Sequence, residues 1–220
     1  MVDMKLTLPI LREEAKLFCE NESAKEHPEL FGVTDGKAVG TYVEHKFQNY
    51  LSSKYEFTIG SSAKGIDLPD DFINTDIKVT SIKQPQSSCP FKNTNQKVFG
   101  LGYNLLVFVY KKEDIGEKCY LRFQHCTFIE SSKTADYTLT KRLREMVKDG
   151  AIKEDILGFL EDKNVPGDEI ILNQIADQVL SNMPEQGYLT ISNALQWRLQ
   201  YKRVINLHNE VPGVYNYDWI

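Results

Sequence analysis

The sequence contains few of the residues that cross-link small proteins or bind transition metals. It has four cysteines in 220 residues, none in a C-x-x-C pair, and four scattered histidines. The N-terminal stretch also lacks the order of a secretory signal, because charges at Arg12, Glu13 and Glu14 interrupt its apolar residues. We therefore expect neither a disulfide framework nor a zinc site, and we predict a cytoplasmic protein with reduced thiols.

Long apolar runs and an excess of positive charge are missing as well. No stretch approaches the roughly 20 apolar residues that span a bilayer, so we expect no membrane span. The chain carries 31 acidic and 26 basic residues and a net charge of -5, which is not the basic balance typical of a nucleic-acid-binding domain. Carboxylates that hold a metal ion would, however, count toward the acidic total. The hydrophobic fraction of 41% is that of an ordinary globular protein.

The periodicity of the apolar residues predicts an α/β fold with a mixed central sheet flanked by helices. An N-terminal helix is followed by an amphipathic helix at 36–55, in which Val39, Val43, Phe47 and Leu51 recur every four residues. Strand patterns and a short helix follow in the order 55–60, 65–68, 75–82, helix 96–103, 104–112 and 118–130. The run at 104–112 is nearly all apolar, which is typical of a strand covered on both faces.

The C-terminal part is predicted to be helical. Helical spacing recurs at 139–150, 153–163, 169–182 and 190–209, with glycines and a proline between the segments. The polar side of the last segment either faces solvent or contacts a nucleic acid.

Three charged residues interrupt two adjacent predicted strands. Side chains alternate along a strand, so Asp76 and Lys78 share one face and Ile77 points to the other. A hairpin-like pairing would bring Asp67, on the preceding strand, to the same face. Two carboxylates and the Ile77 carbonyl then form an oxygen-only pocket suited to Mg²⁺. Such a site favours metal-assisted hydrolysis of a phosphodiester, with Lys78 orienting the attacking water.

Asp76, Lys78 and the neighbouring aspartates allow more than one interpretation. Asp76 and Lys78 could instead form a solvated ion pair on the strand surface, which would contribute little stability. Asp70 and Asp71 closely follow Asp67, so each of the three is a candidate for the first carboxylate. We favour Asp67 because apolar residues flank it, whereas the other two follow a proline in a predicted turn.

The pattern D-x(n)-D-x-K, preceded by an amphipathic helix with an inward glutamate, resembles the PD-(D/E)XK nuclease superfamily. The run "DIKVTSIKQPQSSCPFK" is similar to its type II restriction endonucleases. The resemblance implies that Asp67 and Asp76 bind the metal, that Lys78 is catalytic and that Glu44 is an auxiliary carboxylate. A surface position explains Glu44 equally well. Ile66 stands before Asp67 where the family pattern has a proline.

The element order of residues 38–130 resembles the core of this superfamily, and the resemblance does not extend to the C-terminal helices. Residues 1–135 would form a nuclease-like core, with its catalytic elements at about 38–130. Residues 136–220 would form a helical region that packs on the core as one domain.

The function implied is Mg²⁺-dependent hydrolysis of DNA at a short duplex site by a metal-activated water, with Mn²⁺ as a substitute. A palindromic site would require a homodimer. The alternatives are a repair, recombination or junction-resolving nuclease of the same superfamily, and a non-catalytic DNA-binding module in which the pattern is accidental. The polar loop after the third strand is either an ordinary surface loop or a DNA contact through Gln84, Gln86, Ser87, Ser88, Lys92 and Asn93.

Overall fold

The computed structural model describes all residues except 1–3, 61–64, 90–91, 193–196 and 220. The chain divides into two compact units. The first unit consists of residues 1–86, 103–129 and 208–220, and the second consists of residues 87–102 and 130–207.

A four-stranded mixed sheet forms the centre of the first unit. β1 pairs in parallel with β3, whereas the β3–β4 and β4–β7 pairs are antiparallel. The strand order is β1-β3-β4-β7, so β1 lies at an edge of the sheet. The predicted mixed sheet is therefore confirmed, and its strands are β1 (Thr75–Ser81), β3 (Asn104–Ile115), β4 (Lys118–Ile129) and β7 (Val214–Asp218).

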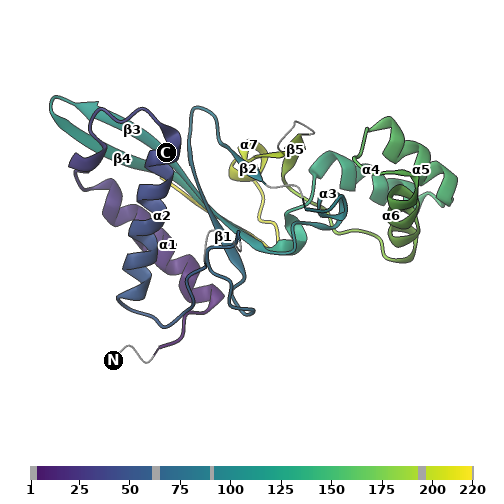
Figure 1. Ribbon diagram of the computed structural model, residues 1–220, viewed down its shortest axis with the longest axis horizontal. Coiled ribbons are helices and arrows are strands. Elements are labelled where there is room, and N and C mark those ends of the chain that lie inside the picture. The colour runs from purple at the N-terminus through teal and green to yellow at the C-terminus, as the bar shows by residue number, and fades with distance from the viewer. Residues whose placement is uncertain (1–3, 61–64, 90–91, 193–196, 220) are drawn as a thin grey trace. The chain divides into compact units, whose positions relative to one another are not determined.

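Two helices, α1 (Leu8–Ser23) and α2 (Gly36–Ser52), pack on this sheet (Figure 1), and a short 3-10 helix, η1 (Pro28–Leu30), lies between them. The carboxylate of Asp35 caps α2 by accepting hydrogen bonds from two backbone N–H groups. The predicted apolar stripe is buried, and Phe47 packs edge-to-face on Phe108 of β3 at a centroid distance of 5.0 Å. This packing fixes α2 beside β1.

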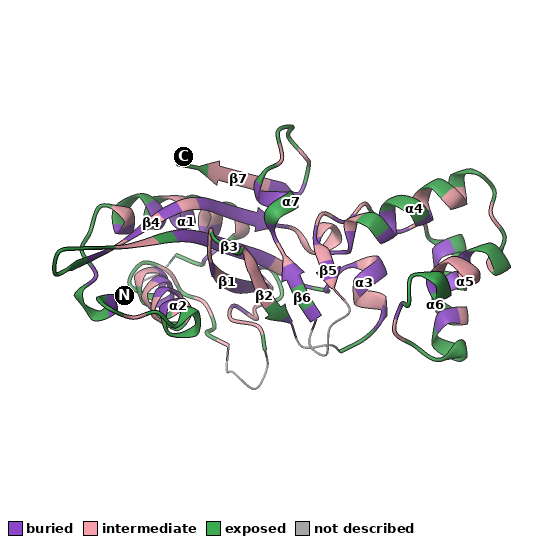
Figure 2. Cartoon of the chain, turned by 90° about the horizontal axis from the view of Figure 1, so that it is seen from above, coloured by how far each residue is buried: buried purple, intermediate pink, exposed green. Residues whose placement is uncertain are grey.

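The apolar run of β3 is buried on both faces, as its composition predicted. Residues 105–110 are all buried, and the exposed part of the strand begins at residue 111 (Figure 2). Leu106, Phe108 and Tyr110 belong to the core that contains α1 and α2.

The second unit combines a small sheet with a group of helices. Its sheet has the strand order β2-β6-β5, and its helical core includes Leu143, Ile156, Leu160, Ile175 and Val179. No described helix of either unit is long and apolar enough to cross a membrane. The elements of the second unit are β2 (Gln86–Cys89), α3 (Asn95–Phe99), η2 (Ser131–Lys133), α4 (Tyr137–Lys148), α5 (Lys153–Asp162), α6 (Glu169–Ser181), β5 (Thr190–Ser192), β6 (Trp197–Gln200) and α7 (Lys202–Ile205).

The prediction of one long helix at 190–209 is wrong. This stretch forms β5, β6 and the short helix α7. In β6, Trp197 and Leu199 are buried while Arg198 is exposed, which is the period of two that marks a half-buried strand. The same alternation is visible in the sequence, but the prediction relied on the helical spacing of residues 190–209 instead. Residues 193–196, whose polar members were expected on the polar side of this helix, lie outside the described residues.

The two strands predicted at 55–60 and 65–68 are wrong as well. The first contributes a single bridge to Lys5, and the second contributes a single bridge between Leu68 and Thr75. Strand-forming residues gain little without a neighbouring strand that completes a ladder. The second bridge nevertheless sets the geometry of the candidate site.

Candidate functional site

The edge of β1 brings two of the predicted carboxylates together. Leu68 and Thr75 exchange both backbone hydrogen bonds, at 3.0 and 2.9 Å, in an antiparallel bridge. In this register Asp67 lies opposite Asp76, and residues directly opposite one another project to the same face. The Asp67 side chain lies close enough to Asp76 to raise the pKa of the Asp76 carboxyl group.

The backbone of β1 adds an oxygen at the same place. Asp67 Oδ2 accepts a hydrogen bond of 2.7 Å from the N–H of Ile77. A strand residue directs its N–H and its C=O toward the same edge. The carbonyl of Ile77 therefore faces the edge at which Asp67 lies.

Lys78 lies against Asp76. Its Nζ is 2.7 Å from Asp76 Oδ2, and the two side chains are 21% and 5% exposed. The pair is thus largely shielded from water, unlike the solvated surface ion pair that was the simpler interpretation. A shielded ion pair is screened less by salt and holds both groups in a fixed geometry.

Helix α2 supplies a fourth charged group. Glu44 is half-buried, hydrogen-bonds to Asp67 and lies within electrostatic range of Lys78. Burial raises the pKa of Glu44, and the charge of Asp67 raises it further, while His45 and Lys78 oppose the shift. The site therefore holds three carboxyl groups and one ammonium group.

The positive charge of Lys78 only partly stabilises the ionised carboxyl group of Asp76. Burial, the largest cause, together with Asp67 raises its pKa to about 7, although Lys78 opposes the shift. A hard cation that prefers oxygen ligands would favour the ionised form, so the donor set of Asp67, Asp76 and the Ile77 carbonyl fits Mg²⁺. The described residues contain no group of three or more histidine, cysteine or carboxylate side chains arranged to hold a metal ion, so this donor set consists of two carboxylates and one backbone carbonyl.

The raised pKa of Asp76 predicts that the metal-free protein loses stability as the pH rises from about 4 to about 7. Between the ordinary pKa of 3.8 and the folded value of about 7, the folded state binds more protons than the unfolded state. The free energy of unfolding therefore falls with rising pH, by at most about 1.4 kcal/mol per pH unit for one proton. Denaturant titrations in EDTA would measure this slope, and Asp76→Asn should flatten it. Equal slopes in the two proteins would contradict the prediction.

The other two candidate aspartates serve a turn. Asp70 Oδ2 accepts from the N–H of Thr58 at 2.8 Å, and its backbone carbonyl accepts from the N–H of Asn74 at 2.7 Å. Asp71 is exposed. Of the three, the structure brings Asp67 next to Asp76.

The loop after β1 presents two side-chain amides. Within the described part of the chain, the amides of Gln84 and Gln86 have no hydrogen-bond partner. The backbone of both residues is tied to the hydroxyl of Thr80. Thr80 was not among the predicted site residues, although the period of two places it on the face of Asp76 and Lys78.

Two of the remaining predicted DNA-contact residues already use their side chains in hydrogen bonds within the protein, and the other two are exposed. The Ser87 hydroxyl is 2.5 Å from that of Tyr201. The side chain of Asn93 accepts from the N–H of Asn95 at 2.9 Å. Ser88 and Lys92 are exposed.

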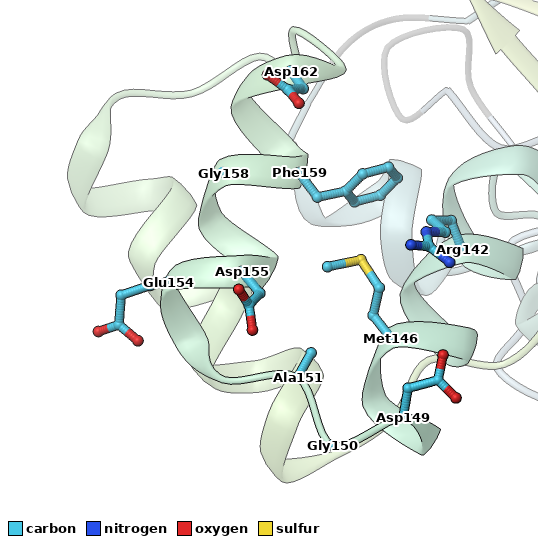
Figure 3. A pocket seen from close by; sticks show the side chains of 10 residues that line it. All are labelled: Arg142, Met146, Asp149, Gly150, Ala151, Glu154, Asp155, Gly158, Phe159 and Asp162. Atoms are coloured by element: carbon cyan, nitrogen blue, oxygen red, sulfur yellow. The ribbon is translucent and has the colours of Figure 1, made fainter.

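A separate pocket of about 660 Å³ lies between α4 and α5 (Figure 3). Met146 and Phe159 point into the space between the helices, whereas Glu154 points away from it. Its lining includes four carboxylates and only one cationic side chain, that of Arg142. This balance disfavours a polyanion such as DNA, so we place the candidate site at β1.

Comparisons with known proteins match nearly the whole chain. Residues 5–216 match the family described as type II restriction enzyme NspV. A curated relative, "Type II restriction enzyme NspV" from Nostoc sp. (strain ATCC 29411 / PCC 7524), is 50% identical over 211 residues, which cover 95% of each chain. No solved structure matches.

Proposed function

We propose, because this chain belongs to the family of type II restriction enzyme NspV, that it hydrolyses DNA phosphodiester bonds at a specific short duplex site with Mg²⁺. Mn²⁺ would substitute. The observation that best supports this chemistry is the convergence of Asp67, Asp76 and Lys78 at the edge of β1. Glu44 from α2 adds a third carboxyl group to this cluster of charged side chains.

Each group has a role in the proposed reaction. Asp67, Asp76 and the Ile77 carbonyl would hold the ion, and Glu44 lies beside Asp67 with a raised pKa. Mg²⁺, when bound, supplies positive charge that acidifies water and offsets the charge that develops on the phosphate. Lys78, held by Asp76, orients the attacking water and stabilises the transition state. The water attacks phosphorus in line and the phosphodiester P–O bond breaks, without a covalent enzyme intermediate.

Digestion of DNA of known sequence, followed by mapping of the fragment ends, tests this function. We expect discrete ends at one short sequence with Mg²⁺ and no cleavage in EDTA. Cleavage that follows DNA structure or damage rather than sequence would favour a repair or junction-resolving nuclease. An absence of cleavage with both Mg²⁺ and Mn²⁺ would overturn the enzymatic function.

The same digestion bears on assembly. Symmetric ends on the two strands would support a homodimer, since a two-fold protein matches a two-fold site. We expect light scattering of the protein on a short cognate duplex to give a protein mass of twice 25.3 kDa. A single copy on the duplex would contradict the homodimer.

A further inference from the structure

Thr80 occupies the same face of β1 as the charged site. It lies two residues beyond Lys78 and four beyond Asp76, so strand alternation places all three on one side. Its residue exposure is 6%. A buried hydroxyl that makes no hydrogen bond lowers the stability of the fold.

That hydroxyl holds the returning loop. Thr80 Oγ1 accepts from the N–H of Gln86 at 3.1 Å, and it lies 3.0 Å from the carbonyl of Gln86 and 3.2 Å from that of Gln84. A hydroxyl has one proton, so it donates to one of these two carbonyls at a time. The N–H of Gln84 also donates to the carbonyl of Ser81 at 3.2 Å, which closes the turn.

The loop that Thr80 holds carries two side-chain amides of the kind that contact DNA bases. The amides of Gln84 and Gln86 have no partner among the described residues, and a side-chain amide pairs bidentately with the major-groove edge of adenine. Along the strand, Thr80 lies about 13 Å from Asp76, which is about four base-pair steps of B-DNA.

We propose that Thr80 is a positioning residue for site recognition. By fixing the backbone of Gln84 and Gln86 on the strand that carries Asp76 and Lys78, its hydroxyl sets the distance between the bases that are read and the bond that is cut. The inference rests on the proposed function, because it concerns the same DNA substrate.

The test is the effect of Thr80→Val on site discrimination. Valine keeps the shape and the strand preference of threonine but removes the donor and the acceptor. We expect the ratio of kcat/KM on the cognate site to that on sites with one altered base to fall about tenfold or more, the equivalent of one lost base contact. The fall should appear mainly in KM for the cognate site, and Thr80→Ser, which keeps the hydroxyl, should restore discrimination.

Thr127 of β4 offers a matched control. It is fully buried, and its hydroxyl has no hydrogen-bond partner among the residues that the structure describes. Thr127→Val therefore removes a buried hydroxyl without releasing a loop. Its discrimination should equal that of the wild type. A purely structural role of Thr80 would instead lower the melting temperature and leave the discrimination ratio unchanged.

Wild-type discrimination in Thr80→Val would overturn the inference, as would an equal loss in Thr127→Val or Thr80→Ser. If Thr80→Val does not fold, the double variant Gln84→Ala/Gln86→Ala tests the inference instead. Wild-type discrimination in the double variant would show that these two glutamines do not read the bases, and the inference would be overturned. If the wild type cleaves DNA but Thr80→Val keeps wild-type discrimination, the inference about Thr80 is wrong while the proposed function stands. A wild type that does not cleave removes both.

Discussion

Asp76→Ala should abolish Mg²⁺-dependent cleavage, with a fall in kcat/KM of about 10³-fold or more. The substitution removes a proposed metal ligand and the carboxylate that lies 2.7 Å from the Nζ of Lys78. DNA affinity should stay the same or increase, because negative charge near the phosphates is lost. Single-turnover cleavage and DNA binding in Ca²⁺ would separate these two effects.

The control for this prediction is Asp71→Ala. Asp71 is an exposed carboxylate on the same stretch of chain, and its removal changes the net charge equally. We expect near-wild-type cleavage. If Asp71→Ala and Asp76→Ala lose activity equally, or if Asp76→Ala cleaves normally, the role assigned to Asp76 is wrong.

Asp67→Asn should lower kcat/KM by about 10²-fold or more, whereas Asp70→Asn and Asp71→Asn should retain activity. Asparagine keeps an oxygen to accept the hydrogen bond from the N–H of Ile77, so the fold is preserved while the ionic ligand is lost. Cleavage rates of the three variants over a Mg²⁺ titration would compare them directly.

The opposite pattern would reassign the first carboxylate. Full activity in Asp67→Asn together with a loss in Asp70→Asn would identify Asp70 as the ligand. The hydrogen bond from Thr58 to Asp70 would then have to open when the metal binds. The role of Asp76 would stand in that case, because a different experiment tests it.

Local periodicity predicted the parts of the site that lie within single elements. The apolar stripe of α2 and the two faces of β1 are properties of one helix and one strand. In the structure the stripe is buried, Lys78 pairs with Asp76, and Ile77 packs in the core. The sequence pattern placed Asp76 and Lys78 on one face before any pairing was known. A period of two also marked β6, where the competing helical interpretation was chosen and was wrong.

Placements that depend on register could not be derived from the sequence. The position of Asp67 opposite Asp76 follows from one bridge between Leu68 and Thr75, and a shift of one residue would turn Asp67 to the other face. The role proposed for Thr80 likewise depends on a loop that returns to its own strand.

The central claim is that the edge of β1 holds the catalytic metal ion. Anomalous diffraction from crystals soaked in Mn²⁺ tests it most directly. We predict a peak about 2.0–2.3 Å from the carboxylate oxygens of Asp67 and Asp76 and from the carbonyl oxygen of Ile77. A peak at Asp70 or Asp71, with none beside Asp76, would contradict the claim.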